Sequence, residues 1–121
     1  MIRKEEDALV TISNNPRGGI GEIIGKQLIL ESDMENNLNG IYVNYLDINS
    51  EIGYHEHHDE DEIYYILDGI GIANDNGVEF EISSGSVLYT KAGSGHALRN
   101  TGNKALKFLA FMIKHDKTLK I

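Results

Sequence analysis

The stretch from Gly53 to Gly69, GYHEHHDEDEIYYILDG, decides how this chain is interpreted. His55 and His57 are two residues apart, so on a β-strand both imidazoles project from the same face. Two neutral imidazoles side by side are suitable ligands for a borderline divalent metal. The pair alone is weak evidence, because an exposed strand can carry two histidines at no cost, and the acidic run beside them is typical of a solvated loop. The spacing of further candidate ligands along the chain distinguishes a metal site from a solvated surface cluster.

Short apolar runs separated by turn residues continue along most of the chain. Thirteen Gly and one Pro punctuate segments that alternate like strands, and we find no sustained helical spacing of apolar residues. Asp75-Asn76-Gly77 predicts a tight hairpin turn, because asparagine and glycine tolerate positive φ. We expect strands at residues 26–31, 40–48, 53–58, 62–67, 70–74, 78–82, 87–90, 96–100 and 106–113. This pattern predicts an all-β sandwich or barrel.

The two ends of the chain are less regular. Gly18, Gly19 and Gly21 lie close together, with no strand expected before them and no Lys-Ser/Thr pair after them. A phosphate-binding loop is therefore disfavoured. We interpret residues 1–25 as a flexible, irregular lead-in and residues 114–121 as a frayed tail.

Size, charge and cysteine usage limit the possible functions. A chain of 121 residues predicts a single domain over residues 1–121. The net charge of −8 argues against nucleic acid and anionic membranes as partners, since both require a cationic surface. No apolar run is long enough for a membrane span, and the N-terminus lacks the apolar segment of a signal peptide, so we expect a cytoplasmic protein. Because there is no cysteine, any metal would have nitrogen and oxygen ligands.

Further candidate ligands lie at the start of two other expected strands. Glu62 begins one strand, and His96 begins another after a glycine-rich turn. Three imidazoles and one carboxylate would leave one or two positions of an octahedral site open, as a catalytic metal requires. Glu60 and Asp61 compete with Glu62 for the carboxylate role. His58 has the opposite strand parity, so we expect it at the rim.

Two other side chains have open interpretations. His115 stands alone near the C-terminus, and we expect it to be exposed. Tyr64 shares the parity of Glu62 and either lines a cavity or packs in the core. The metal is equally open, since manganese, iron, cobalt, nickel, copper and zinc all accept such nitrogen and oxygen ligands.

The spacing of these residues resembles the first motif of the cupin superfamily. That motif has Gly, five residues, His-x-His, three or four residues, Glu, six residues and Gly. The chain has His55 and His57, four residues, Glu62, six residues and Gly69. Asn49 stands where the leading glycine would be.

The second cupin motif is also matched, in the expected order. It has Gly, five residues, Pro-x-Gly, two residues, His, three residues and Asn. The chain has Gly85, five residues, Lys91-Ala92-Gly93, two residues, His96, three residues and Asn100. Lys91 replaces the proline, which places a cation near the rim of the expected barrel. Neither departure involves a predicted ligand.

The resemblance implies a fold, a site and a set of functions. The implied fold is an antiparallel jelly-roll β-barrel, also called a double-stranded β-helix. The implied metal ligands are His55, His57, Glu62 and His96, because only Glu62 among the acidic residues gives both motif gaps. Asn100 corresponds to a structural position. Small cupins often form dimers by pairing or exchanging N-terminal strands, so we expect a homodimer.

The resemblance leaves the reaction open. We favour a small metalloenzyme of oxygenase, isomerase or lyase type that acts on a small molecule. The alternative is a non-catalytic barrel that binds or senses a small molecule or metal. A purely structural dimer is disfavoured by the intact ligand set.

Overall fold

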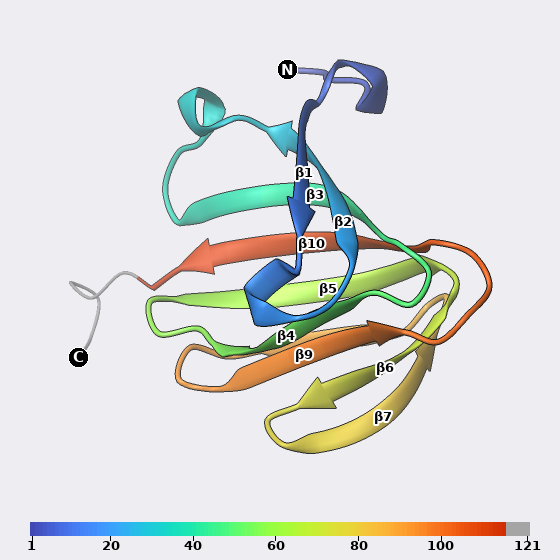
Figure 1. The fold of residues 1–121 in the computed structure, drawn as a ribbon. Helices are drawn as coiled ribbons and strands as arrows, with labels where there is room; N and C mark the ends of the chain where they lie inside the picture. The colour runs from blue at the N-terminus through green and yellow to red at the C-terminus, as the bar shows by residue number, and fades with distance from the viewer. Residues whose placement is uncertain (116–121) are drawn as a thin grey trace.

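The computed structural model describes residues 1–115 and shows two layers of antiparallel strands (Figure 1). Three short 3-10 turns, η1 (Glu5–Asp7), η2 (Pro16–Gly18) and η3 (Glu31–Asp33), lie in the N-terminal third. Ten strands follow one another as β1 (Leu9–Asn14), β2 (Glu22–Ile29), β3 (Leu38–Leu46), β4 (Glu51–Glu56), β5 (Glu60–Asp68), β6 (Ile70–Asp75), β7 (Val78–Ser83), β8 (Val87–Thr90), β9 (Gly95–Asn100) and β10 (Leu106–Lys114). No α-helix occurs in this part of the chain, which confirms the all-β prediction.

The strands form two sheets that face each other. One sheet has six strands in the order β1-β2-β3-β10-β5-β8, and the other has four in the order β4-β9-β6-β7. Every pairing is antiparallel, and the two sheets remain separate ladders without closing into one. The chain crosses between the layers several times, for example from β3 to β4 and from β4 to β5. This arrangement is the jelly roll that the sequence predicted.

The space between the sheets has an apolar end. Its fully buried side chains include Leu46, Leu98, Leu106 and Phe108, and Ile66 is only 2% exposed. Residues from both sheets contribute, because alternate positions of each strand face inward. This core holds the two layers together.

Asn100 fixes the polar loops at that apolar end. Its buried side-chain nitrogen donates to the backbone oxygens of Leu46 (2.9 Å), Asp47 (3.1 Å) and Lys104 (2.8 Å). Its side-chain oxygen accepts a hydrogen bond from the backbone nitrogen of Gly102. The asparagine of the second motif therefore has the structural role that the sequence predicted.

The turn between β6 and β7 also matches its prediction. Asn76 has φ of 50° and Gly77 has φ of 98°, so both residues are in the left-handed region that a tight hairpin requires. The flanking strands pair up to Asp75 and Val78.

The prediction of an irregular lead-in over residues 1–25 was wrong. β1 and β2 form a hairpin whose register runs from Leu9 opposite Gln27 to Asn14 opposite Glu22. All six residues of β1 are exposed, so backbone pairing with β2, without burial of an apolar face, orders this strand. Such a strand lacks the burial pattern on which sequence interpretation depends.

The predicted tail begins later than expected. β10 continues to Lys114, and the backbone nitrogen of His115 donates to the carbonyl of Asp59 at 2.9 Å. The remaining part of the predicted tail, residues 116–121, lies outside the described residues. Within residues 1–115 there is no helix of the length and apolarity needed to cross a bilayer.

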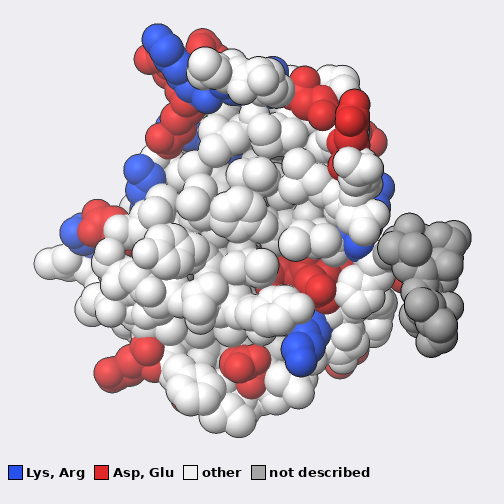
Figure 2. Space-filling model, turned by 180° about the vertical axis from the view of Figure 1, so that it is seen from behind, with Lys and Arg blue, Asp and Glu red and all other residues white. Residues whose placement is uncertain are grey.

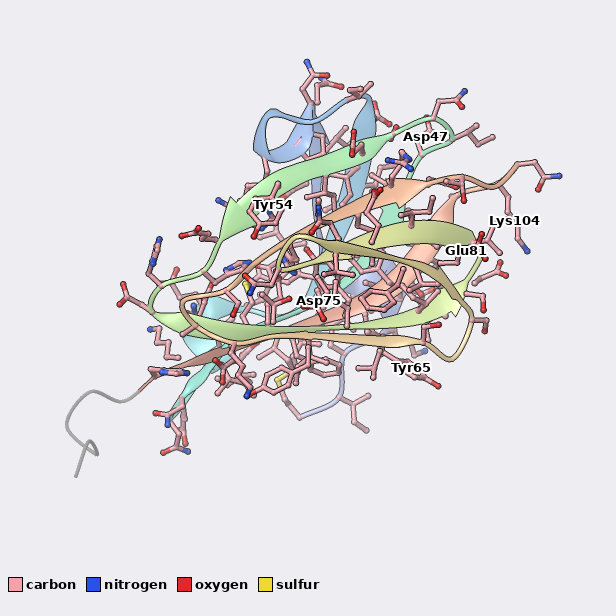
Figure 3. The ribbon with its side chains drawn as sticks, turned by 90° about the horizontal axis from the view of Figure 1, so that it is seen from below. Asp47, Tyr54, Tyr65, Asp75, Glu81 and Lys104 are labelled. Carbon is pink, nitrogen blue, oxygen red and sulfur yellow. The ribbon has the colours of Figure 1, made fainter. Side chains whose placement is uncertain are left out.

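The outer face of the six-stranded sheet has exposed apolar side chains along β5 and β8. Tyr65 on β5 is 41% exposed, and its cross-strand neighbour Val87 on β8 is 62% exposed. Tyr89 on β8 is 49% exposed beside Ile63. Viewed from behind, this side of the molecule has a broad area with few charged residues (Figure 2). From below, Tyr54 of β4 and Tyr65 of β5 lie on opposite sides of the two layers (Figure 3).

Candidate metal centre

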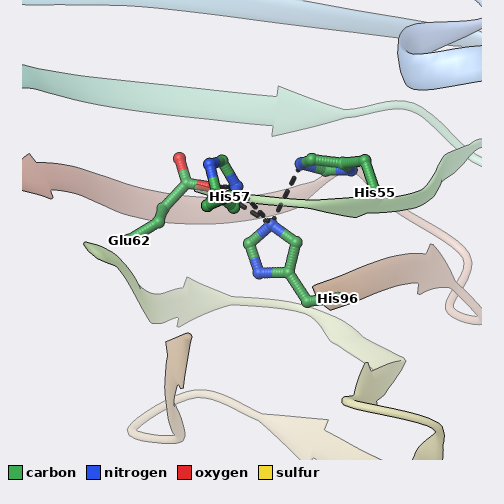
Figure 4. Close-up of side chains that lie close together, drawn as sticks. All are labelled: His55, His57, Glu62 and His96. Atoms are coloured by element: carbon green, nitrogen blue, oxygen red, sulfur yellow. Dashed lines mark hydrogen bonds and ion pairs between the residues drawn. The ribbon is translucent and has the colours of Figure 1, made fainter. Parts of the chain in front are cut away.

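The structure brings together the four side chains that the sequence singled out. His55 lies on β4, His57 follows the end of β4, Glu62 lies on β5 and His96 lies on β9, so both sheets contribute. One possible ligand atom from each side chain lies within 4.8 Å of the others. His57, Glu62 and His96 are buried, whereas His55 is partly exposed. Figure 4 shows the His96 ring pointing toward the other three.

The distances inside the cluster fit a metal with nearly right angles between its ligands. His96 Nε2 lies 3.1 Å from His55 Nε2, 3.1 Å from His57 Nε2 and 3.0 Å from Glu62 Oε1. His57 Nε2 lies 2.9 Å from Glu62 Oε1. Ligands bound at about 2.1 Å and at right angles are about 3.0 Å apart. A single proton on His96 Nε2 cannot serve three such neighbours, so the donor set suits a shared cation.

Hydrogen bonds on the far side of each imidazole orient the three Nε2 atoms. Nδ1 of His55 lies 2.8 Å from the carbonyl oxygen of Gly53, where only a protonated Nδ1 makes a hydrogen bond. Nδ1 of His57 lies 3.3 Å from Glu60 Oε1, and Nδ1 of His96 lies 2.7 Å from Thr90 Oγ1. With Nδ1 protonated, each neutral ring has its lone pair on Nε2. Such partners fix the tautomer and direction of metal-binding histidines.

The electrostatics of the cluster also suit a cation. Burial is the main cause that lowers the pKa of His55 to about 4, and the nearby His96 and Arg17 act in the same direction. Burial alone would raise the pKa of Glu62, but hydrogen bonds with His57 and His96 outweigh it and lower this pKa to about 2. The hydrogen bond with Glu62 raises the pKa of His57. At neutral pH the site therefore has a carboxylate and a neutral His55, and a proton at His57 would compete with a metal.

Tyr64 lies directly against the cluster. Its ring stacks on His96 with centroids 4.8 Å apart, and its hydroxyl lies 3.4 Å from His96 Nε2. Burial raises its pKa well above the usual value, so the hydroxyl stays protonated. Both sequence interpretations of Tyr64 hold, because it lines a cavity and also packs on Phe108.

Two adjoining cavities open beside the cluster. The smaller, of about 150 Å³, is lined by His55, Glu62, Tyr64, Ile52, Ile23, Asn44, Pro16 and Arg17. The second, of about 320 Å³, shares Arg17, Ile23, Asn44 and Glu62 with the first. A hollow of about 640 Å³ elsewhere on the surface includes none of the four clustered residues. The two smaller cavities therefore give access to the candidate metal centre.

The competing candidates have other roles. Glu60 lies behind His57 as its Nδ1 partner, outside the cluster of four. Asp61 accepts a hydrogen bond from the backbone nitrogen of Ala92, and its Oδ1 lies 2.7 Å from His115 Nε2. His115 is exposed, as expected. The side chain of His58 is 71% exposed near Glu56, as the rim position predicted.

Three features of the site were not found from the sequence. Thr90 was treated only as the end of a strand, although its hydroxyl contacts His96 Nδ1. Arg17 lies in the segment interpreted as a flexible lead-in, although it lines both cavities. Asn44 lies in the expected strand at residues 40–48 and was given no role, although it lines the same cavities. The run of alternating residues from Val10 to Ser13, followed by a Pro-Arg-Gly-Gly turn, was the signal that could have revealed the hairpin carrying Arg17.

The fold and the site together define a class of protein. A family model described as Cupin domain matches residues 45–112, which include all four clustered residues. The chain therefore belongs to the cupin family, as the motif spacing indicated.

Particular relatives come from Thermotoga maritima. The protein named oxalate-binding protein is 40% identical over 113 residues, which cover 93% of this chain and 93% of that protein. A crystal structure described as a predicted oxalate decarboxylase from the same organism has a TM-score of 0.90 and 36% identity, covering 95% of this chain and all of that one. The structure of KdgF from a Halomonas species has a TM-score of 0.75 over 98% of both chains, at 15% identity, so it shows only a shared fold.

Proposed function

We propose that the protein binds one divalent transition metal through His55, His57, Glu62 and His96 and uses this metal to hold a small carboxylate anion. The observation that carries the proposal is the convergence of three imidazoles and one carboxylate. His96 Nε2 lies 3.0–3.1 Å from an atom of each of the other three side chains, and one possible ligand atom from each side chain lies within 4.8 Å of the others. Manganese, iron, cobalt, nickel, copper and zinc all fit these nitrogen and oxygen donors. Four protein ligands leave open positions in a six-coordinate site.

A small carboxylate suits the surroundings of the cluster. A divalent metal would act there as a Lewis acid that attracts carboxylate oxygens. The adjoining cavity of about 150 Å³ is of a size for a small molecule. The Thermotoga maritima protein named oxalate-binding protein, and the structure from the same organism described as a predicted oxalate decarboxylase, support a carboxylate as small as oxalate.

The first test is elemental analysis of protein purified without chelators or a nickel column. We expect about one metal ion per chain in the unmodified protein and almost none in the double variant Glu62→Ala with His96→Ala. The variant His58→Ala serves as the control, since that imidazole is exposed. Unchanged metal content in the double variant would refute the ligand assignment. Calorimetric titration of metal-loaded protein with oxalate then tests the anion.

Catalysis is the second candidate function, with oxygenase, isomerase and lyase chemistry all open. Tyr64 favours it, because a buried hydroxyl that stays protonated beside the clustered side chains can donate a hydrogen bond to a bound substrate. NMR of oxalate and other small acids incubated with the metal-loaded protein would detect products. Tight binding without any product would leave the non-catalytic function.

We also propose a homodimer, formed through the outer face of the six-stranded sheet. An antiparallel sheet with apolar residues on both faces is typical of one covered on both sides. Tyr65, Val87, Tyr89 and Ile113 are each 39–62% exposed on this face. With their less exposed neighbours they present on the order of 500 Å² of apolar surface, a large share of the about 800 Å² per partner of a standard interface.

Light scattering after size exclusion tests the dimer. We expect Tyr65→Arg to give a monomer and Tyr54→Arg, on the other sheet, to stay dimeric. A dimer that survives Tyr65→Arg would instead favour pairing through β1, which has exposed Leu9, Val10 and Ile12 at the sheet edge. The cytoplasmic location stays a prediction, which cell fractionation would test.

A further inference from the structure

The turn between β1 and β2 holds an arginine at the mouth of the metal-centre cavities. Arg17 lines both cavities, together with Glu62. Two other described arginines have acidic neighbours: Arg3 pairs with Asp33, and Arg99 lies near Glu51. No hydrogen bond or ion pair involves the Arg17 guanidinium within residues 1–115. An exposed guanidinium without a partner at a cavity mouth can serve a ligand.

The backbone of this turn is held in an uncommon conformation. Arg17 has φ of 54° and ψ of 36°, the left-handed region that costs a non-glycine residue on the order of 1 kcal/mol. Asn15 also has a positive φ, and its side-chain oxygen accepts a hydrogen bond from the backbone nitrogen of Gly21. The backbone nitrogens of Gly18 and Gly19 donate to Asn15 and Pro16. Local hydrogen bonds therefore hold Arg17 in a backbone conformation that is unfavourable for a non-glycine residue.

The turn is also seated on the strand that carries His55. The backbone groups of Ile20 and Glu51 exchange two hydrogen bonds, of 2.9 and 2.8 Å. A Cβ at Gly19 would lie 1.9 Å from the Glu51 oxygen, and one at Gly53 would lie 2.3 Å from the Arg17 oxygen. Only glycine at both places allows this close contact. The glycine cluster thus has a structural purpose, which is to bring residue 17 against β4.

The charges and cavity sizes suit a small dianion. Among residues 1–115, Glu62 is the only carboxylate that lines either cavity, and a divalent metal would more than neutralise it. A metal-bound ligand would therefore face a positive centre on one side and the Arg17 guanidinium on the other. Asn44 lines both cavities as well and offers an amide donor.

We propose that Arg17 is the specificity-determining residue of this site, and that it binds the second carboxylate of a short dicarboxylate whose first carboxylate is on the metal. The inference rests on the proposed function of the metal centre. The planar guanidinium makes two parallel hydrogen bonds to a carboxylate. A monocarboxylate on the metal has no second carboxylate to accept them. Short dicarboxylates are therefore preferred to acetate or formate.

The test is calorimetric titration of the manganese-loaded protein with oxalate and with acetate. We expect Arg17→Gln to keep its manganese and its melting temperature but to bind oxalate roughly 10- to 100-fold more weakly, with the preference over acetate largely lost. Arg17→Lys keeps the positive charge but cannot make the two parallel hydrogen bonds of a guanidinium, so we expect an intermediate loss of oxalate affinity. Lys91→Gln is the control, because this exposed cation at the rim lines neither cavity.

The possible outcomes separate the inference from the function on which it rests. Unchanged oxalate affinity in manganese-loaded Arg17→Gln would overturn the role of Arg17 and leave the metal centre intact. An equal loss in Lys91→Gln would reduce the role of Arg17 to general attraction of anions, which also overturns it. If unmodified metal-loaded protein bound no carboxylate at all, the proposed function and this inference would both be wrong.

Discussion

The two ends of the space between the sheets differ in chemistry and in purpose. At one end, Phe108, Leu46 and Leu106 are fully buried and the interior is apolar. At the other end, the interior is filled by imidazoles and a carboxylate, and His96 Nε2 lies 3.0–3.1 Å from an atom of each of the other three. Burial of apolar surface stabilises a fold, whereas buried ionisable groups cost free energy unless they are paired. The apolar end therefore supplies stability, and the polar end depends on it.

The largest expected effect is the loss of metal from a variant that changes only the polar end. His55→Ala removes a proposed ligand that is only partly buried, so we expect little loss of stability but a reduction of metal content to a small fraction of one ion per chain. Elemental analysis and a thermal melt of the metal-free protein measure the two quantities. A large drop in the melting temperature of the metal-free protein would show that the two ends are not separable.

A substitution at the apolar end is expected to lower stability and leave metal content unchanged. Phe108→Ala leaves a cavity among fully buried side chains, and we expect unfolding free energy to fall by about 3–5 kcal/mol. Urea denaturation of metal-free protein checks this value. Below the unfolding transition, the metal content per chain should be unchanged. Loss of metal from folded Phe108→Ala would contradict the separation of roles between the two ends. The contact between Phe108 and Tyr64 would then explain how the change reaches His96.

A smaller effect is expected at the polar residue inside the apolar end. Asn100→Ala leaves the backbone oxygens of Leu46, Asp47 and Lys104 without their shared donor. Unsatisfied buried acceptors cost about 1–3 kcal/mol, which urea denaturation can resolve. The exposed Asn103→Ala is the matched control. If Asn100→Ala were as stable as this control, the structural role of the second motif's asparagine would be wrong.

The smallest expected effect is a modest loss of metal affinity when a partner of His96 at the polar end is changed. Thr90→Val keeps the shape of the side chain but removes the hydroxyl beside His96 Nδ1. We expect metal affinity to fall roughly 10-fold, because an unanchored ring loses its fixed direction. A competition titration with a coloured chelator measures it. An affinity equal to that of the unmodified protein would mean that ring stacking on Tyr64 suffices to orient His96.

The sequence predicted most of the polar end, because its information is in spacing. The gaps from His57 to Glu62 and from Gly85 to His96 are set by the lengths of strands and turns, which a single sequence displays. The strands from β3 to β10 were predicted close to their observed positions for the same reason, since burial on one face produces alternation.

The position of Arg17 beside the four clustered side chains could not be predicted in this way. β1 buries no side chain, so its alternation has no consistent inward face, and its order comes from pairing with a neighbour. The orientation of the β1–β2 turn depends on the contact between Gly19 and Glu51, residues 32 positions apart. The direction in which Arg17 points is therefore a tertiary property, which no local pattern contains.

The seating of the Arg17 turn on β4 has a consequence for how this protein can be redesigned. The turn is anchored by backbone hydrogen bonds between Ile20 and Glu51 and by glycines, and none of these anchors uses the side chain of residue 17. Residue 17 can therefore be exchanged while His55, His57, Glu62 and His96 keep their positions. A library confined to position 17 and to Asn44 would vary the cavity lining beside an unchanged set of proposed metal ligands.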